Sequence, residues 1–87
     1  MLPMIFLTEI RELARQLGLD PNHLVIKEPF VDANLRGRRY GFKYSVNGQT
    51  YDYNFIVSRI DIDAGVESEV VRLYVNIGLR ELKAMRR

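Results

Sequence analysis

Three arginines, Arg36, Arg38 and Arg39, stand within four consecutive positions that contain no acidic residue. A guanidinium group presents several N–H donors in a fixed fork, which suits the oxygens of a phosphate. Because side chains alternate along a strand, Arg39 is expected on the same face as Lys43, and Arg38 on the opposite face. We therefore predict a nucleic-acid-binding site formed by Arg36, Arg38, Arg39 and Lys43 that contacts phosphates rather than bases. The alternative interpretation is a solvated charged patch without a ligand.

The sequence contains no other arrangement typical of a catalytic or metal centre. It has a single histidine, His23, and no cysteine, which excludes disulfides, thiolate ligands, cysteine nucleophiles and multi-histidine metal sites. Asp61 and Asp63 fall on one face and could hold a hard cation, but carboxylates at the start of a helix more often cap it. No glycine-rich phosphate loop is present. We expect a protein that is not an enzyme and that binds no cofactor or metal.

Composition places the chain among small globular proteins. It has 87 residues, 47% hydrophobic residues and a formal net charge of +2, which predicts one domain over residues 1–87 with a modest core. The apolar opening MLPMIFL is short and lacks a basic leader, so neither a signal peptide nor a membrane partner is expected. The absence of cysteine fits a reducing compartment, and a cytoplasmic location is the expectation.

A β-hairpin over residues 38–57 is the clearest structural signal. Asn47 and Gly48 suit the positive φ angles of a two-residue type I′ turn. That turn pairs Val46 with Gln49 and places all six aromatic side chains of the hairpin on one face. These are Tyr40, Phe42, Tyr44, Tyr51, Tyr53 and Phe55. We expect this face to be the core beneath the helices, and a platform for stacking nucleic-acid bases is the alternative.

An amphipathic helix is predicted over residues 9–17, where apolar residues recur at helical spacing. Thr8 is the expected N-cap, and Gly18 is expected to end the helix in the left-handed conformation.

The segment after this helix has two interpretations. Asp20 and Pro21 could begin a second helix and make a helix-turn-helix motif. However, Pro29 disfavours helix at the residue before it, which leaves barely two turns for a recognition helix. We therefore favour a turn followed by a strand over residues 24–28, which are rich in β-branched residues.

The remaining segments are predicted with less regular patterns. Residues 30–37 are expected to be a loop, and strand character is expected to continue from the hairpin to Asp63. A long helix is then predicted from Ala64, because acidic residues lie near its start and basic residues near its end. Its expected apolar face comprises Val66, Val70, Leu73, Tyr74, Ile77 and Leu82. A strand over 70–76 followed by a short helix over 79–86 is the alternative.

These elements follow the order αβββα, which predicts an α+β domain with a three-stranded antiparallel sheet packed against two helices. With its segments ELARQLGL and RRYGFKYSVNGQTY, the chain resembles the double-stranded RNA-binding domain. The resemblance implies three duplex-contacting regions, which are the outer face of the first helix, the loop over 32–38 and the start of the last helix. On the first helix the matching positions are Glu9, Glu12 and Gln16. Where the family carries lysines in the third region, this chain carries Asp61, Asp63, Glu67 and Glu69.

Two functional hypotheses follow. The first is a non-catalytic nucleic-acid-binding module that contacts duplex RNA or DNA through the four cations. The second is a protein–protein interaction or regulatory module, acting on another protein or as a homodimer, built on the same scaffold. Fold alone does not decide between them.

Overall fold

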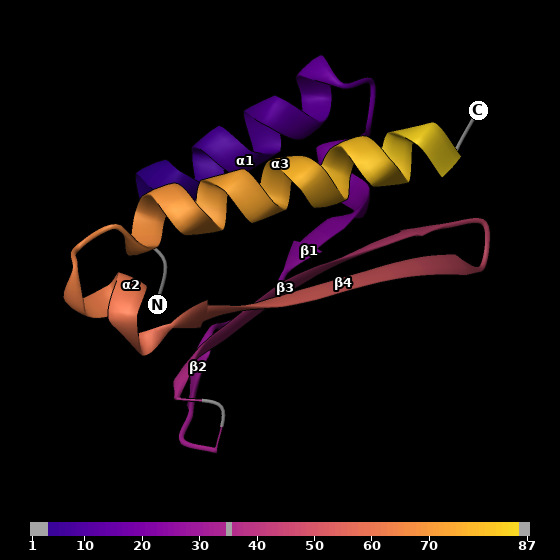
Figure 1. Cartoon of the computed structure of the whole chain (residues 1–87). Coiled ribbons are helices and arrows are strands. Elements are labelled where there is room, and N and C mark those ends of the chain that lie inside the picture. Colours follow the sequence, from indigo (N-terminus) through magenta and orange to yellow (C-terminus); the bar gives the residue numbers. More distant parts are fainter. Residues whose placement is uncertain (1–3, 35, 86–87) are drawn as a thin grey trace.

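A computed structural model of the chain describes residues 4–34 and 36–85, and the side chains from residue 7 onward. Within these residues the chain is a small α+β domain with a four-stranded antiparallel sheet and three α-helices (Figure 1). The helices are α1 (Met4–Gln16), α2 (Arg59–Asp63) and α3 (Glu67–Met85), with a short 3-10 helix, η1, over Pro21–His23. The strands are β1 (Leu24–Ile26), β2 (Phe30–Asp32), β3 (Gly37–Val46) and β4 (Gln49–Ser58).

The β3–β4 hairpin has the register that the sequence predicts. Val46 pairs with Gln49, Lys43 with Asp52, and Tyr40 with Phe55. Asn47 and Gly48 have φ angles of 53° and 79°, as a type I′ turn requires at both central positions. The predicted aromatic face is therefore confirmed as one face of the hairpin.

The prediction of three strands and of a loop over residues 30–37 is wrong, because β1 and β2 are separate strands along the same side of β3. Ile26 pairs with Phe42, and Phe30 pairs with Arg39. The segment from Ile26 to Phe30 therefore advances by four residues, while the opposing segment of β3 advances by three. The extra residue lies in the segment that contains Pro29, which has no N–H to donate to the ladder. The predicted strand over 24–28 is thus confirmed only as far as Ile26, and a second strand resumes at Phe30.

The end of α1 follows the prediction. Gly18 has a φ of +79°, its N–H donates to the Arg15 carbonyl at 3.0 Å, and the Leu19 N–H donates to the Ala14 carbonyl at 2.9 Å. This pattern is a Schellman cap. The start differs, because α1 begins at Met4 and includes Thr8 within its helix. Asp20 then caps only the single turn η1, so no second helix and no helix-turn-helix motif forms.

The segment after the hairpin contains two helices instead of a longer strand and one helix. Ser58 caps α2 by accepting a hydrogen bond from the Asp61 N–H, which ends the strand five residues before the predicted limit of Asp63. Gly65 follows with a φ of +77°, and α3 begins at Glu67 rather than Ala64. A helix over residues 70–77 is confirmed, and the alternative strand is wrong.

Helices α1 and α3 lie side by side over one face of the sheet (Figure 1). The core between these two helices and the sheet contains the aromatic face of the hairpin. It also contains Ile10, Ala14, Leu19, Leu24, Val57, Val71, Val75, Leu79 and Leu82. Gly78 allows α3 to approach the sheet closely, because a Cβ there would lie 2.7 Å from Cδ2 of Tyr53 and 3.0 Å from Cε2 of Phe42. In the part of the chain that the structure describes, the opposite face of the sheet carries no helix (Figure 1).

We predict that Gly48→Val destabilises the fold by about 1–3 kcal/mol, because a β-branched residue is strained at positive φ. Nothing within 4 Å would contact a new Cβ at this position, so the cost comes from the backbone alone. Urea denaturation measures the effect, and Gly48→Asn is the control because asparagine tolerates this conformation. Equal stability of wild type and Gly48→Val would contradict the turn type.

Candidate functional site

The four predicted phosphate-contacting cations do not form one cluster. Arg36 is exposed in the turn between β2 and β3, with a φ of 49°. Its carbonyl accepts a hydrogen bond from the Arg59 N–H at 2.9 Å, which ties this turn to the start of α2. Arg39 and Lys43 lie on the open face of the sheet, where their cross-strand partners are Ile56 and Asp52. The structure therefore brings Arg39 and Lys43 onto the same face and separates both from Arg38.

Arg38 faces the helices and serves to hold α3 on the sheet. Its Nη1 donates to Oε2 of Glu67 at 2.6 Å, in the first turn of α3, and the Tyr40 hydroxyl donates to the same carboxylate oxygen. The bond to Glu67 raises the pKa of the guanidinium above its ordinary value. Burial, followed by the bond to Glu67, raises the pKa of Tyr40 to about 12. Arg38 is thus committed to a partly buried ion pair rather than directed at solvent.

The open face of the sheet combines cations with acids. Arg39 faces Asp32 across the sheet, with 3.6 Å between Nη2 and Oδ2. Lys27, which the sequence analysis did not single out, donates to Oδ1 of Asp52 at 2.6 Å and to Oδ1 of Asn54 at 2.7 Å. Its hydrogen bond lowers the pKa of Asp52. Lys27 directly follows β1, so only the pairing of β1 with β3 could have predicted its contacts with Asp52 and Asn54. The spacing of residues in the sequence gives no sign of them.

The aromatic face is largely inaccessible to a stacking ligand. Tyr40, Phe42, Tyr44 and Phe55 are buried in the core, while Tyr51 and Tyr53 are half-buried next to α3. Rings within the face contact one another, as Tyr40 and Phe55 do at a centroid separation of 5.6 Å. The interpretation of this face as core is confirmed.

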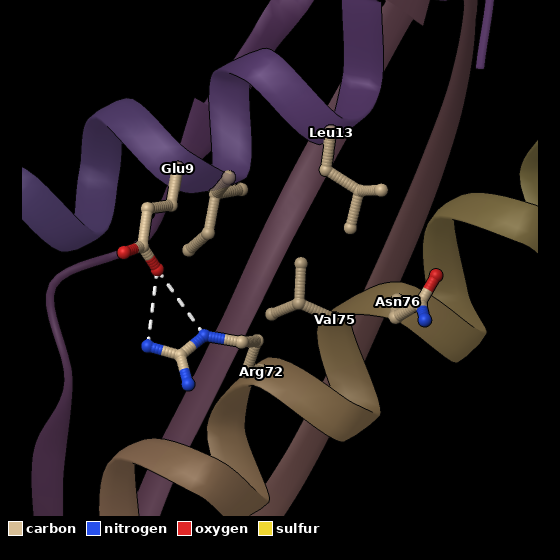
Figure 2. Close-up of a pocket in the computed structure, with 6 residues that line it drawn as sticks. Glu9, Leu13, Arg72, Val75 and Asn76 are labelled. Carbon is tan, nitrogen blue, oxygen red and sulfur yellow. Dashed lines mark hydrogen bonds and ion pairs between the residues drawn. The ribbon is translucent and has the colours of Figure 1, made fainter. Parts of the chain in front are cut away.

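A cleft of about 280 Å³ lies between α1 and α3. Figure 2 shows Leu13 and Val75 pointing toward each other across it. At one end, Nη2 of Arg72 lies 3.0 Å from Oε2 of Glu9, and this ion pair joins the two helices. Glu9, one of the three positions matched to the RNA-contacting helix face by resemblance, is therefore engaged by α3. Glu12, the second of them, pairs with Arg15 on its own helix.

Helix α3 carries several exposed apolar side chains on one side. The predicted apolar face of this helix is mostly not the buried one, because the core takes Val71, Val75, Gly78, Leu79 and Leu82 instead. The side of α3 facing away from α1 consists of Val70, Leu73, Tyr74 and Ile77, and together with Val66, which directly precedes the helix, we name it the apolar flank of α3. Leu73, Tyr74 and Ile77 are 57%, 37% and 45% exposed. Helix α3 therefore has a second apolar side that the core of the domain leaves largely exposed.

Strand β4 runs beside the apolar flank and forms an edge of the sheet. In the described part of the chain it pairs with β3 alone. The ring of Tyr74 stacks on Phe55 of β4 at a centroid distance of 5.2 Å, which places the flank above this edge. The sequence signal for this surface is a pair of neighbouring apolar stripes at helical spacing. One comprises residues 71, 75, 79 and 82, and the other comprises residues 66, 70, 73 and 77.

The described residues contain no group of three or more His, Cys, Asp or Glu side chains placed to hold a metal ion. Asp61 lies in the first turn of α2, and Asp63 pairs with Arg59 on the same helix. Over residues 4–34 and 36–85, no helix combines the length and apolar character needed to cross a bilayer.

Comparison with protein families, with curated proteins and with solved structures found no significant match to this chain. Evidence on function therefore comes from the open face of the sheet and from the apolar flank of α3 beside β4.

We predict that the contribution of Tyr40 to stability depends on pH in the alkaline range. A raised pKa means that the folded state favours the protonated phenol, so the stabilisation is present below pH 10 and is lost as the pH rises through about 12. The difference in unfolding free energy between wild type and Tyr40→Phe should be constant below this window and shrink by about 2–3 kcal/mol across it. Urea denaturation at a series of pH values measures this difference. A difference that stays flat across the window would contradict the prediction.

Proposed function

We propose that this domain is a non-catalytic protein-interaction module that binds its partner through the apolar flank of α3 and the adjacent edge of β4. The observation that carries the proposal is the second apolar face of α3, where Leu73, Tyr74 and Ile77 stay exposed beside a core that buries the other face. Clustered apolar residues of this kind mark interaction sites, whereas single exposed ones are ordinary.

Physical considerations favour this surface over the others. Burying apolar area contributes roughly 25 cal/mol per Å², so covering Leu73, Tyr74 and Ile77 supplies binding energy without new charges. The neighbouring strand edge adds unpaired peptide groups, and strand addition at such an edge supplies affinity through main-chain hydrogen bonds. By contrast, the cations Arg38, Arg39 and Lys27 already have acidic partners within the chain.

We extend the proposal to the scaffold. If β1 and β2 are counted as one strand interrupted near Pro29, the order of elements becomes αβββα, apart from the short helices η1 and α2. This order supports the resemblance to the double-stranded RNA-binding domain as a fold. The scaffold would then be shared while the contact surface differs.

Nucleic-acid binding is the second candidate function, and exposed cations in the β2–β3 turn and along β3 favour it. Arg36 and Lys43 are exposed, and Arg39 is half-buried between them. Contact with phosphates by these three residues would be weak and tolerant of sequence, since phosphates carry no base identity. In this proposal Arg38 is a structural residue.

The interaction proposal predicts crosslinks from one face of the molecule. A photo-crosslinking amino acid at position 73 or 77, in the full chain expressed in the organism that encodes it, should give discrete adducts with a protein. The same amino acid at Val25, which is 61% exposed on the open face of the sheet, is the matched control. Adducts that are absent from positions 73 and 77, or equally strong at position 25, would overturn the proposal.

The nucleic-acid candidate predicts salt-dependent binding that three substitutions remove. Three neutralised phosphates give a slope of log K against log salt of roughly −2 to −3. Titration of labelled duplex RNA, duplex DNA and single strands at two salt concentrations measures it. The combined variant Arg36→Ala, Arg39→Ala, Lys43→Ala should abolish binding, whereas Arg11→Ala, Arg15→Ala, Arg80→Ala, with the same charge change elsewhere, should not. No binding at low salt, or equal loss in both variants, would exclude this candidate.

A further inference from the structure

The peptide groups on the free edge of β4 can be assigned from the hairpin register. In a two-residue hairpin the residues flanking the turn, here Val46 and Gln49, form a hydrogen-bonded pair, and bonded and non-bonded pairs then alternate. The odd-numbered residues of β4 therefore bond to β3. The even-numbered residues, which are Thr50, Asp52, Asn54, Ile56 and Ser58, point their N–H and C=O groups away from it. On β3 the same alternation is observed, because the Gly41 carbonyl, opposite Asn54, accepts from the Lys27 N–H at 2.9 Å.

This edge lacks the usual features that prevent strand addition. Residues 49–58 contain no proline and no lysine, and the hairpin is ten residues long on each strand. Its one charge is Asp52, whose carboxylate is engaged by Lys27 on the open face. From Tyr51 to Val57 the side chains of β4 on the helix face are apolar or aromatic, and the apolar flank of α3 lies above them.

We infer that the partner of this surface is a second copy of the chain, joined antiparallel to the first through β4 across a twofold axis at Tyr53. This inference rests on the proposed function and names its partner. An axis at residue 53 pairs Thr50 with Ile56 and Asp52 with Asn54 of the second copy, whereas an axis at residue 54 would need Ser58, which already caps α2. An axis at residue 52 would place two Asp52 carboxylates opposite each other, which is unfavourable.

The same register determines where the helices lie. Opposite residues of a pair point to the same face, so both copies carry their helices on one side of an eight-stranded sheet. Gly78 of α3 lies against Tyr53, so the axis passes near the middle of this helix and the two α3 helices run antiparallel. Their apolar flanks then face each other around Ile77.

Charge supports a second copy over an unrelated strand. The first turn of α3 is acidic, with Glu69 beside Glu67, which is already engaged by Arg38. At the other end, Lys83 donates to the Leu17 carbonyl, and Arg86 and Arg87 follow in the sequence. An antiparallel arrangement brings the acidic start of one helix toward the basic end of the other. The surface is therefore complementary to itself in apolar area, hydrogen-bonding groups and charge.

Sedimentation velocity of the purified full chain over a wide concentration range tests the inference. We expect a species of twice the 10.2 kDa chain mass. Asn54→Pro removes an outward N–H at the interface and leaves the β3–β4 ladder intact, because Asn54 does not donate to β3. It should weaken dimerisation roughly tenfold or more, because a symmetric dimer loses the same hydrogen bond at two equivalent positions. Asn54→Ala, which removes the same side chain but keeps the N–H, is the control and should still dimerise.

A second variant guards against a folding defect in Asn54→Pro. Ile77→Lys changes an exposed side chain on α3, so it should keep the circular-dichroism spectrum of the folded wild type and lose the dimer. A wild-type chain that is monomeric at all concentrations overturns the inference, as does a dimer that both variants leave unchanged. A monomer that still crosslinks through position 73 to a different protein would overturn the second copy alone. A monomer without crosslinks would remove the proposed function as well.

Discussion

The register of the β3–β4 hairpin is the constraint on which the rest of the molecule depends. A shift of one residue would move every aromatic ring of the hairpin to the open face and leave α1 and α3 without a surface to cover. The turn at Asn47 and Gly48 prevents that shift, because both residues adopt the positive φ angles that a two-residue connection needs. The position of α3 follows from the same register, since Gly78 meets Tyr53 and the Arg38–Glu67 ion pair ties the start of the helix to β3.

Features determined by neighbouring residues were predictable from the sequence. The turn, the strand register and the Schellman cap at Gly18 each depend on a few adjacent positions. Features determined by distant contacts were not. The strand character of Phe30–Asp32 arises only because β3 offers it a partner, and the composition around it is that of a loop. Likewise, Ser58 ends β4 by capping α2, although the alternation of Ile60 and Ile62 with Asp61 and Asp63 resembles a continuing strand.

The candidate site illustrates the same division. Sequence proximity suggested that Arg36, Arg38 and Arg39 act together. Alternation along β3 instead points Arg38 toward the helices, where it donates a hydrogen bond to Glu67. Nothing in the spacing of the sequence links residues 38 and 67. The apolar residues of α3 were recognised, whereas the choice of which ones the core would bury depended on how the helix rotates over the sheet. That rotation leaves Leu73 and Ile77 in solvent and gives the domain its apolar flank.

The interruption between β1 and β2 gives the sheet two unlike margins. On the β4 side the margin is one ten-residue strand, while on the other side two strands of three residues flank a proline that has no N–H. A broken ladder of this kind is a poor template for a further chain. A sheet extended through β4 would therefore present a broken margin at both ends, so growth would stop at a closed pair instead of continuing into a filament.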